Sequence, residues 1–327
     1  MKYKQLGNTG MKISECALGT WAIGGDWGQR DDKEALRAID VAIESGVNFF
    51  DTADVYGSGH SEELLAEATK GREESIYIAT KFIRMGDITD PANYSEAQIR
   101  TYLENSLKRL NREQIDLFQV HCAPFNMLKE TDLFPILDKL KQEGKIRAYG
   151  VSIETVDEGL FVLDQTNASA LQVIFNVLRQ KPQDVLFPKA KEQNVGILAR
   201  VPLASGLLTG KYTADTTFSS DDHRHYNRDG QAFNVGETFG GLPFQKGVEL
   251  ANEVAWIAEG RGSLARASLK WILENDAVTS VIPGFRNVKQ VQDNLAAVDE
   301  KGYSAEEMAR LEEFYWTKVH QHIRGAY

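Results

Sequence analysis

The chain has 327 residues, with 37 Lys and Arg against 47 Asp and Glu and a formal net charge of -10 at pH 7. The charges form no long runs, so the composition argues against nucleic-acid binding through a basic surface. Cys16 and Cys122 are too few for a disulfide framework and lack metal-ligand spacing, so we expect two buried thiols in a reducing compartment. With no signal-peptide core and no long apolar stretch, a cytoplasmic protein that does not engage a membrane is expected.

The first elements precede a regular alternation. Two short strand patterns around the turn-forming residues 8–10 predict a hairpin over residues 3–16. A first strand ends within residues 16–21, and a helical pattern over 31–45 ends at Gly46. Further strands are predicted near 47–51, 76–81, 115–121, 148–152, 171–176, 196–200 and 278–282. Helices are predicted near 61–70, 95–110, 132–143, 155–165 and 184–193.

Eight strands that alternate with helices can close into a (β/α)8 barrel, an α/β fold whose sites lie at the C-terminal ends of the strands. The open doubly wound alternative requires a Gly-x-Gly-x-x-Gly motif, and residues 19–25 have a different spacing. The polar, Gly-rich residues 212–244 predict a long loop over the mouth of the barrel. Helices follow near 246–259, 263–275, 288–297 and 304–317. No linker divides the chain, so residues 1–327 are expected to form a single domain.

Titratable side chains stand near the ends of three successive predicted strands. Asp51 and Tyr56 lie at the end of the first, Lys81 ends the second, and His121 ends the third. Lys81 either extends to the barrel rim or is held in the cleft by an acid. An Asp51–Lys81 pair is expected to lower the pKa of Tyr56 from about 10 and to make it a proton donor near neutral pH. His121 either hydrogen-bonds a substrate carbonyl as a neutral imidazole or is an ordinary core histidine.

Metal binding is the competing use of Asp51, His60 and His121. The chain has no His-Glu-x-x-His motif and no Cys-rich cluster, and its other histidines lie in polar segments. We therefore expect no catalytic metal, which disfavours a metal-dependent barrel hydrolase.

Seven motifs carry a resemblance to a known family. They are Gly-Thr-Trp at 19–21, Asp-Thr-Ala-Asp-Val-Tyr-Gly at 51–57, Thr-Lys at 80–81, Val-His at 120–121, Gly-Val-Ser at 150–152, the 202–211 stretch, and Ile-Pro-Gly-Phe-Arg at 282–286. In this order the set resembles the aldo-keto reductases from about residue 3 to residue 298. It is most similar to the bacterial branch of general-stress and inositol-operon reductases.

The resemblance implies NADPH-dependent reduction of a small-molecule aldehyde or ketone, with NADP+ as the oxidised cofactor. It implies that Tyr56 is the general acid, that Asp51 and Lys81 tune its pKa, and that His121 orients the carbonyl. Trp21, Tyr56 and His121 would line the substrate pocket. The cofactor-binding residues that it implies are Gly19, Thr20, Trp21, Asp51, Ser152, Gln172, Arg200, Leu203, Ser205, Gly206, Leu207, Gly210, Lys211, Gly284, Arg286, Gln290, Asp293 and Asn294.

Within that set, Ser152 and Gln172 would hold the nicotinamide carboxamide, and the 203–211 loop would hold the pyrophosphate. Arg286 and Gln290 would contact the ribose 2′-phosphate, and residues 293–294 the adenine.

Two positions depart from the family pattern. Ile153 follows the carboxamide-binding serine where the family has Asn, and Arg200 stands where relatives have a tyrosine stacked on the nicotinamide. Arg200 either takes that stacking position or is an ordinary surface arginine that points away. The alternative function is a cofactor-sensing accessory subunit of a potassium channel, with negligible turnover. The substrate and any homo-oligomer are not readable from the sequence.

Overall fold

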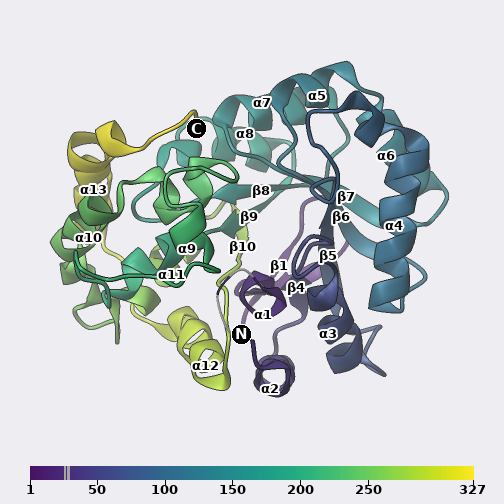
Figure 1. Cartoon of the computed structure of the whole chain (residues 1–327). Helices are drawn as coiled ribbons and strands as arrows, with labels where there is room; N and C mark the ends of the chain where they lie inside the picture. Colours follow the sequence, from purple (N-terminus) through teal and green to yellow (C-terminus); the bar gives the residue numbers. More distant parts are fainter. Residues whose placement is uncertain (26, 28–29) are drawn as a thin grey trace.

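The computed structural model describes residues 1–25, 27 and 30–327 (Figure 1). Within these residues, eight parallel strands follow one another in chain order around a barrel. They are β3 (Leu18–Gly19), β4 (Phe49–Asp51), β5 (Tyr77–Phe82), β6 (Ile115–His121), β7 (Ile146–Ser152), β8 (Ala170–Ile174), β9 (Gly196–Arg200) and β10 (Val278–Val281). An antiparallel hairpin of β1 (Tyr3–Gln5) and β2 (Lys12–Ser14) precedes them, as predicted.

Backbone hydrogen bonds close the barrel between its first and last strands. The Ala17 N–H donates to the Val281 carbonyl and the Val281 N–H donates to the Glu15 carbonyl, each at 2.9 Å. Further along the seam, the Gly19 N–H donates to the Pro283 carbonyl at 3.0 Å. These bonds pair the edges that an open sheet would leave exposed. The predicted (β/α)8 barrel is confirmed.

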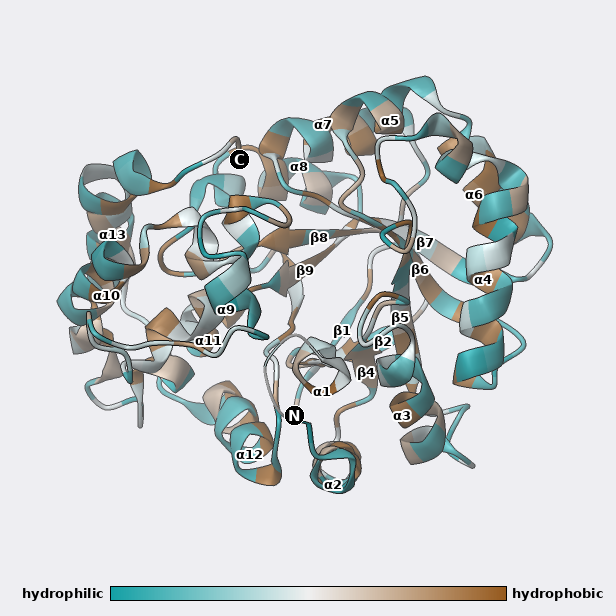
Figure 2. Ribbon diagram, in the orientation of Figure 1, coloured by the Kyte–Doolittle hydropathy of each residue, from teal (hydrophilic) through white to brown (hydrophobic). Residues whose placement is uncertain are grey.

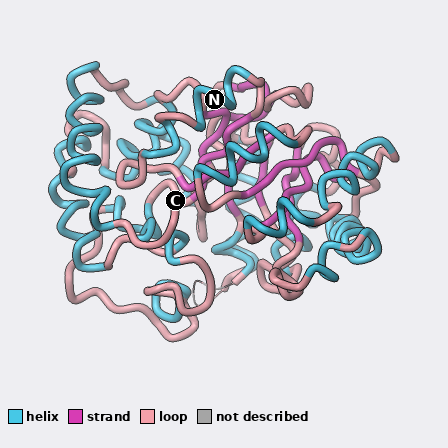
Figure 3. The backbone as a smooth tube through the Cα atoms, turned by 90° about the horizontal axis from the view of Figure 1, so that it is seen from above, coloured by secondary structure: helices cyan, strands magenta, loops and turns pink. Residues whose placement is uncertain are grey.

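Helices cover the outside of the barrel (Figures 1 and 3). They are α2 (Asp32–Glu44), α3 (His60–Thr69), α4 (Glu96–Leu110), α6 (Leu133–Gln142), α7 (Val156–Gln165), α8 (Leu186–Glu192), α11 (Leu264–Leu273) and α12 (Val288–Ala296). Local caps start several of them: the Asp31 side chain accepts the Glu34 N–H at α2, and Thr155 forms a capping box with Glu158 at α7. Within the described ranges, no helix is both long and apolar enough to cross a membrane.

The described residues also form further helical elements. They are α1 (Trp21–Gly24), α5 (Phe125–Glu130), α9 (His223–Tyr226), α10 (Phe244–Glu253), α13 (Ala305–Phe314), a π-helical turn at Tyr315–Val319, and 3-10 turns at Pro91–Tyr94, Lys181–Gln183, Ala204–Thr209, Val235–Glu237, Phe239–Gly241, Ala255–Ala258, Ala297–Asp299 and His320–His322.

The sequence expectations for some of these elements were wrong. Trp21 is the first residue of α1 and does not end a strand. Helices α5 and α9 were not predicted, because they are too short to show a helical period. The expected helices 246–259 and 304–317 each change to a different helical geometry, after Glu253 and after Phe314 respectively.

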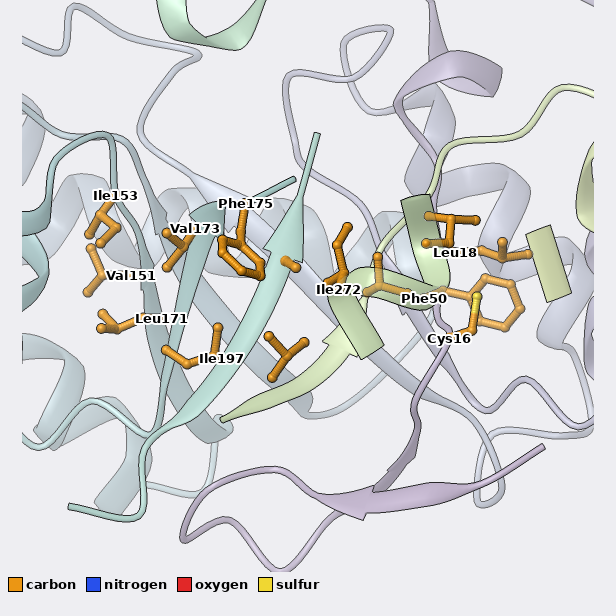
Figure 4. Packing of buried hydrophobic residues seen from close by; sticks show 14 of the residues in the cluster. Cys16, Leu18, Phe50, Val151, Ile153, Leu171, Val173, Phe175, Ile197 and Ile272 are labelled. Carbon is orange, nitrogen blue, oxygen red and sulfur yellow. The ribbon is translucent and has the colours of Figure 1, made fainter. Parts of the chain in front are cut away.

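Alternation along the strands divides the core in two. Inward-facing residues form a buried layer at the base of the barrel, and the hairpin seals it from below. This layer contains Leu6, Met11, Ile13, Phe49, Ala79, Leu117, Ala148, Ala170 and Leu198. The residues that alternate with them along each strand face outward and belong to the larger core between strands and helices. Phe50, Val151 and Leu171 are examples (Figure 4). Figure 2 shows hydrophobic colour along β8 and frequent hydrophilic colour on the outer helices.

The loop after β4 carries a buried acid, Asp54, of which 2% is exposed. Burial, together with the nearby carboxylate of Glu62, raises the pKa of Asp54 to about 7, although Arg109 opposes the shift. Glu62 is itself fully buried and accepts hydrogen bonds from Thr80 Oγ1 at 2.5 Å and Arg109 Nε at 2.6 Å. The guanidinium of Arg109 is therefore already paired with Glu62. Asp54 consequently binds its proton more tightly in the folded chain than in the unfolded chain.

We expect Asp54→Asn to stabilise the protein more at pH 8 than at pH 5. An acid whose folded pKa is raised stabilises the fold below its unfolded pKa, here 3.8, and this contribution is lost as the pH rises through about 7. The shift corresponds to at most about 4 kcal/mol. Thermal unfolding of both proteins between pH 5 and 8.5 measures it, with the exposed Asp215→Asn as control. An equal gain at both ends of the range would contradict the assignment.

Candidate active site

A polar layer lies directly above the apolar layer inside the barrel. Because side chains alternate along a strand, the residues two and four positions beyond the inward apolar ones also face inward. This layer contains Asp51, Lys81, Gln119, His121, Ser152, Gln172 and Arg200. Strand register brings them to similar heights: Lys81 pairs with Gln119, and Ser152 pairs with both His121 and Gln172. The layer therefore collects side chains from six strands at the C-terminal end of the barrel.

Lys81 is the centre of this layer, and its side chain is 1% exposed. Its Nζ donates to Asp51 Oδ2 at 2.5 Å, to the Thr52 carbonyl at 3.0 Å and to the Tyr56 hydroxyl at 3.3 Å. Three donors thus have three acceptors, which is the full capacity of an ammonium group. The structure places Lys81 in the cleft against an acid, so the alternative in which it extends to the barrel rim is wrong.

Two glutamines complete the hydrogen bonding of Asp51. Gln119 Nε2 and Gln172 Nε2 donate to Asp51 Oδ1 at 3.0 and 2.7 Å. The Asp51 main chain is fixed as well, because its carbonyl accepts from both the N–H and the Oγ1 of Thr20. Gln172 and Thr20, expected from the family resemblance to contact the cofactor, therefore also hold Asp51. Gln119 was not identified from the sequence, although it lies two residues before His121 on the same strand and therefore faces inward with it.

The expectation that Tyr56 has a lowered pKa is wrong for this structure. Burial raises the pKa of Tyr56 above its usual value, and the charge on Lys81 lowers it only in part because Asp51 offsets that charge. Burial also acts to lower the pKa of Lys81, but Asp51 and Tyr56 outweigh it and leave that pKa raised. Tyr56 is thus a neutral phenol, and Lys81 a cation, across the physiological range.

His121 and Trp21 lie against Tyr56. The His121 ring meets the Tyr56 ring edge to face at 5.9 Å, and Trp21 stacks on Tyr56 at 5.9 Å. Burial holds the pKa of His121 well below its usual value, and repulsion from Arg84 and Lys81 lowers it further, so the imidazole is neutral. Its Nδ1 is buried without a hydrogen-bond partner among the described residues. A neutral imidazole beside a phenol is suited to hydrogen-bond the same polar ligand atom as that phenol.

Residues 212–244, here called the mouth segment, lie over this end of the barrel (Figure 1). The segment places the His223 ring 4.5 Å from Trp21 and 4.4 Å from Trp27, and the Phe233 ring 6.1 Å from Trp21. Sequence reasoning predicted the segment but did not identify these rings, because no local pattern relates His223 to a tryptophan about two hundred residues earlier.

Arg200 points into the mouth of the barrel, and its side chain is 11% exposed. Its Nη2 lies 3.3 Å from Cys122 Sγ and donates to the Ile153 carbonyl at 3.2 Å. Glu237 of the mouth segment lies 3.8 Å away. The alternative of a surface arginine that points away is therefore wrong, whereas stacking of Arg200 on a nicotinamide stays a prediction.

Cys122, Glu154 and Glu237 place ligand-type atoms within reach of a single metal ion, the one such group found among the described residues. Two guanidiniums contact the same atoms, from Arg84 and Arg200. Burial also raises the pKa of Cys122 to about 11, so the thiol retains its proton. A cation would have to displace both guanidiniums, which disfavours a metal here. Both cysteines are buried and free, as expected.

The residues expected to bind the outer part of a nicotinamide cofactor lie in two neighbouring places. The turn η3 (Ala204–Thr209) and helix α12 both pack on α11. Gly284 is exposed, and a Cβ on it would have nothing within 4 Å, so a ligand can approach the backbone there. Gly206 has a different requirement, because a Cβ on it would lie 2.2 Å from the Tyr212 hydroxyl.

Other members of that set have protein partners. The Arg286 N–H donates to Gln290 Oε1, Asp293 pairs with Arg266 and Lys289, and Asn294 donates to the Gly284 carbonyl. Ser205 Oγ donates to the Glu237 carbonyl, and Ser152 Oγ accepts from Cys122. Gly210 and Lys211 are exposed, Leu203 is half-buried, Leu207 is buried, and Gly19 lies in the closing seam. Gly210 and Lys211, both exposed, follow the first of these places, η3, and Arg286 precedes the second, α12, and such groups fit an anionic ligand.

Comparison with known proteins agrees with this geometry. Residues 15–315 match the model of the Aldo/keto reductase family. The chain is 32% identical over 305 residues to aldo-keto reductase YhdN of Bacillus subtilis (strain 168), across 89% of this chain and 87% of that protein. It is 29% identical over 321 residues to the NADH-specific methylglyoxal reductase of Escherichia coli (strain K12), across 91% and 94%.

Among solved structures, the glycerol dehydrogenase AKR11B4 from Gluconobacter oxydans has a TM-score of 0.77 at 31% identity, and the match covers 100% of this chain and 98% of that one. The family model spans nearly the whole barrel and includes every side chain of the polar layer. This chain therefore belongs to the aldo-keto reductase family of oxidoreductases.

Proposed function

We propose that this protein reduces an aldehyde or ketone to the alcohol with NADPH, and that Tyr56 is the general acid. The observation that carries the proposal is the contact of one buried ammonium, Lys81, with both the Tyr56 hydroxyl and the Asp51 carboxylate. The membership of the chain in a family of oxidoreductases supports it. An assay of NADPH oxidation against a panel of aldehydes, ketones and sugars tests it, and the absence of turnover with the whole panel would overturn it.

Tyr56 is suited to give a proton to a carbonyl oxygen as negative charge develops there. Its phenol is neutral because burial raises its pKa, so the proton is present at physiological pH. Lys81, 3.3 Å from the phenol oxygen, stabilises the phenolate that remains after transfer. His121 is neutral and adjacent, so it can hydrogen-bond the same carbonyl without competing as an acid.

The bound cofactor would supply the hydride that reduces the carbonyl carbon. Ser152 and Gln172 would hold its carboxamide end, since both lie in the polar layer beside Asp51 and His121. The 203–211 loop and the start of α12 would hold its phosphate end, with Arg286 at the 2′-phosphate. The E. coli relative is NADH-specific, so the preference for NADPH depends on residues of this chain and needs its own test.

Tyr56→Phe is expected to retain the ring stacked on Trp21 and to remove the proton. Turnover of a reactive aldehyde should fall by about 10²- to 10⁴-fold, the range of general acid catalysis, while NADPH affinity stays nearly unchanged. Steady-state kinetics and a cofactor titration measure the two effects. Turnover within about threefold of the wild type would show that Tyr56 is not the acid.

Arg286→Ala is expected to weaken NADPH binding by about ten- to a hundredfold and to change NADH binding little, because only the 2′-phosphate can accept charge-assisted bonds from a guanidinium. Titration of both cofactors measures the selectivity. Lys289→Ala is the matched control, since Lys289 is a neighbouring cation that is 83% exposed and pairs with Asp293. An equal loss for both cofactors would leave Arg286 with a structural role.

Arg200→Tyr is expected to tighten NADP+ more than NADPH. Two unit charges about 4 Å apart interact by about 4 kcal/mol at an effective dielectric of 20, so a stacked guanidinium disfavours the cationic oxidised ring. Glu237 at 3.8 Å offsets part of the Arg200 charge, which leaves a difference of a few-fold between the two cofactors. Faster release of NADP+ from the wild type would follow. An unchanged ratio of the two dissociation constants would show that Arg200 does not stack.

A further inference from the structure

A buried acid ties the mouth segment to the ends of two barrel strands. Glu237 is 4% exposed, and its two carboxylate oxygens accept from Nη2 and Nη1 of Arg84 at 2.7 and 3.4 Å. Arg84 follows β5, and Arg200, at 3.8 Å from the same carboxylate, ends β9. Burial acts to raise the pKa of Glu237, but Arg84 and Arg200 outweigh it and hold that pKa below its usual value. The carboxylate is therefore charged.

Arg84 connects this carboxylate to the candidate active site. Its Nε donates to the main-chain carbonyl of His121 at 3.1 Å, while its two terminal nitrogens hold Glu237. The planar guanidinium of Arg84 thus fixes the backbone of His121 and, at the same time, binds Glu237 of the mouth segment. Arg200, the other cation beside Glu237, donates to the carbonyl of Ile153, the residue after Ser152.

The second acid of this cluster does not replace Glu237. Glu154 lies 3.5 Å from Arg84 and accepts from Asn234 Nδ2 at 2.5 Å. Burial raises the pKa of Glu154 to about 7, and the charge of Glu237 contributes to the shift. Near neutral pH, Glu237 is thus the main counter-ion of two guanidiniums. Removing the charge of Glu237 leaves two buried guanidiniums with a single acid, Glu154, as their partner.

We propose that Glu237 is a positioning residue for the candidate active site. Through Arg84 and Arg200 it holds His121 and the stretch around Ser152 in place when the mouth segment lies over the barrel. The proposal rests on the proposed function, because positioning matters only if His121 orients a substrate. It makes the mouth segment part of the active site and not only a cover.

Another anchor of the mouth segment supplies a control. Arg324 donates to Asp229 at 2.6 Å and to the main-chain carbonyl of Gly241 at 3.0 Å. These groups hold the same segment at the surface, and the partners of Arg324 among the described residues all belong to the mouth segment. Asp229→Ala therefore loosens the segment without removing the counter-ion of the two arginines.

The decisive experiment is chemical rescue of Glu237→Ala. This change leaves a space of carboxylate size between two guanidiniums, and acetate can occupy it as a mobile counter-ion. We expect kcat to fall by about ten- to a hundredfold, as for the loss of hydrogen bonds to charged groups, with a smaller change in KM. Acetate should restore kcat in a saturable manner, whereas neutral acetamide should not. The wild type and Asp229→Ala, measured in the same acetate series, report any inhibition by acetate.

A purely structural anchor predicts a different pattern. Asp229→Ala and Glu237→Ala would then lose similar activity, and acetate would rescue neither. That result, or a kcat for Glu237→Ala within about twofold of the wild type, would overturn the proposal. Should the alanine variant not fold, Glu237→Gln keeps the shape and removes the charge. It leaves no space for acetate, but it should still lower kcat more than Asp229→Ala, and a smaller effect would contradict the proposal.

Trypsin cleavage after Arg224 and Arg228, both in the mouth segment, gives a readout that needs no turnover. Acetate should slow cleavage of Glu237→Ala at these sites and leave the wild type unchanged. If the wild type has no carbonyl reductase activity but acetate still protects the variant, the proposed function fails while the ion cluster stands. If acetate protects neither protein and rescues no activity, the role of Glu237 as counter-ion is wrong.

Discussion

The buried ion pair of Asp51 and Lys81 is the interaction on which the candidate active site depends. Both side chains are almost without solvent, at 6% and 1% exposure. Removing two charges from water costs more than their mutual attraction returns unless the remaining polar atoms are also satisfied. Here Gln119, Gln172 and Thr52 satisfy them. The pair therefore requires side chains from several strands to meet inside one barrel, and the barrel in turn fixes the place of the Tyr56 hydroxyl.

Much of this arrangement follows from a period of two along each strand. The predicted ranges 115–121 and 196–200 are the bounds of β6 and β9, because short and largely apolar runs between helical patterns are typical of buried parallel strands. Once a strand is placed, its parity decides which side chains face inward, so the amino-acid sequence alone predicts that Asp51, Lys81 and His121 are neighbours. Parity also points to Gln119, two residues before His121, although nothing in the local sequence marks it as functional.

The remainder depends on contacts between distant parts of the chain. Gln172 reaches Asp51 across 121 positions, and Arg84 reaches Glu237 across 153. No local pattern encodes such a pair, since either residue alone is typical of a solvated surface. The sequence-based expectation for the pKa of Tyr56 was wrong for a related reason. The positions of the strands in the sequence predict that Lys81 lies beside Tyr56. The burial that outweighs the effect of Lys81 on the Tyr56 pKa depends on the closed barrel and on the mouth segment above it.

A raised pKa changes what Lys81 contributes to proton transfer. A phenol with a lowered pKa would be partly ionised before the substrate binds, and the ionised fraction could not act as an acid. In this site Tyr56 retains its proton, and Asp51 balances the charge of Lys81 in the resting state. Negative charge appears only when the carbonyl oxygen takes electron density and draws the proton away. The fixed ammonium 3.3 Å from the phenol oxygen then stabilises the phenolate, so its electrostatic effect is greater in the transition state than in the ground state.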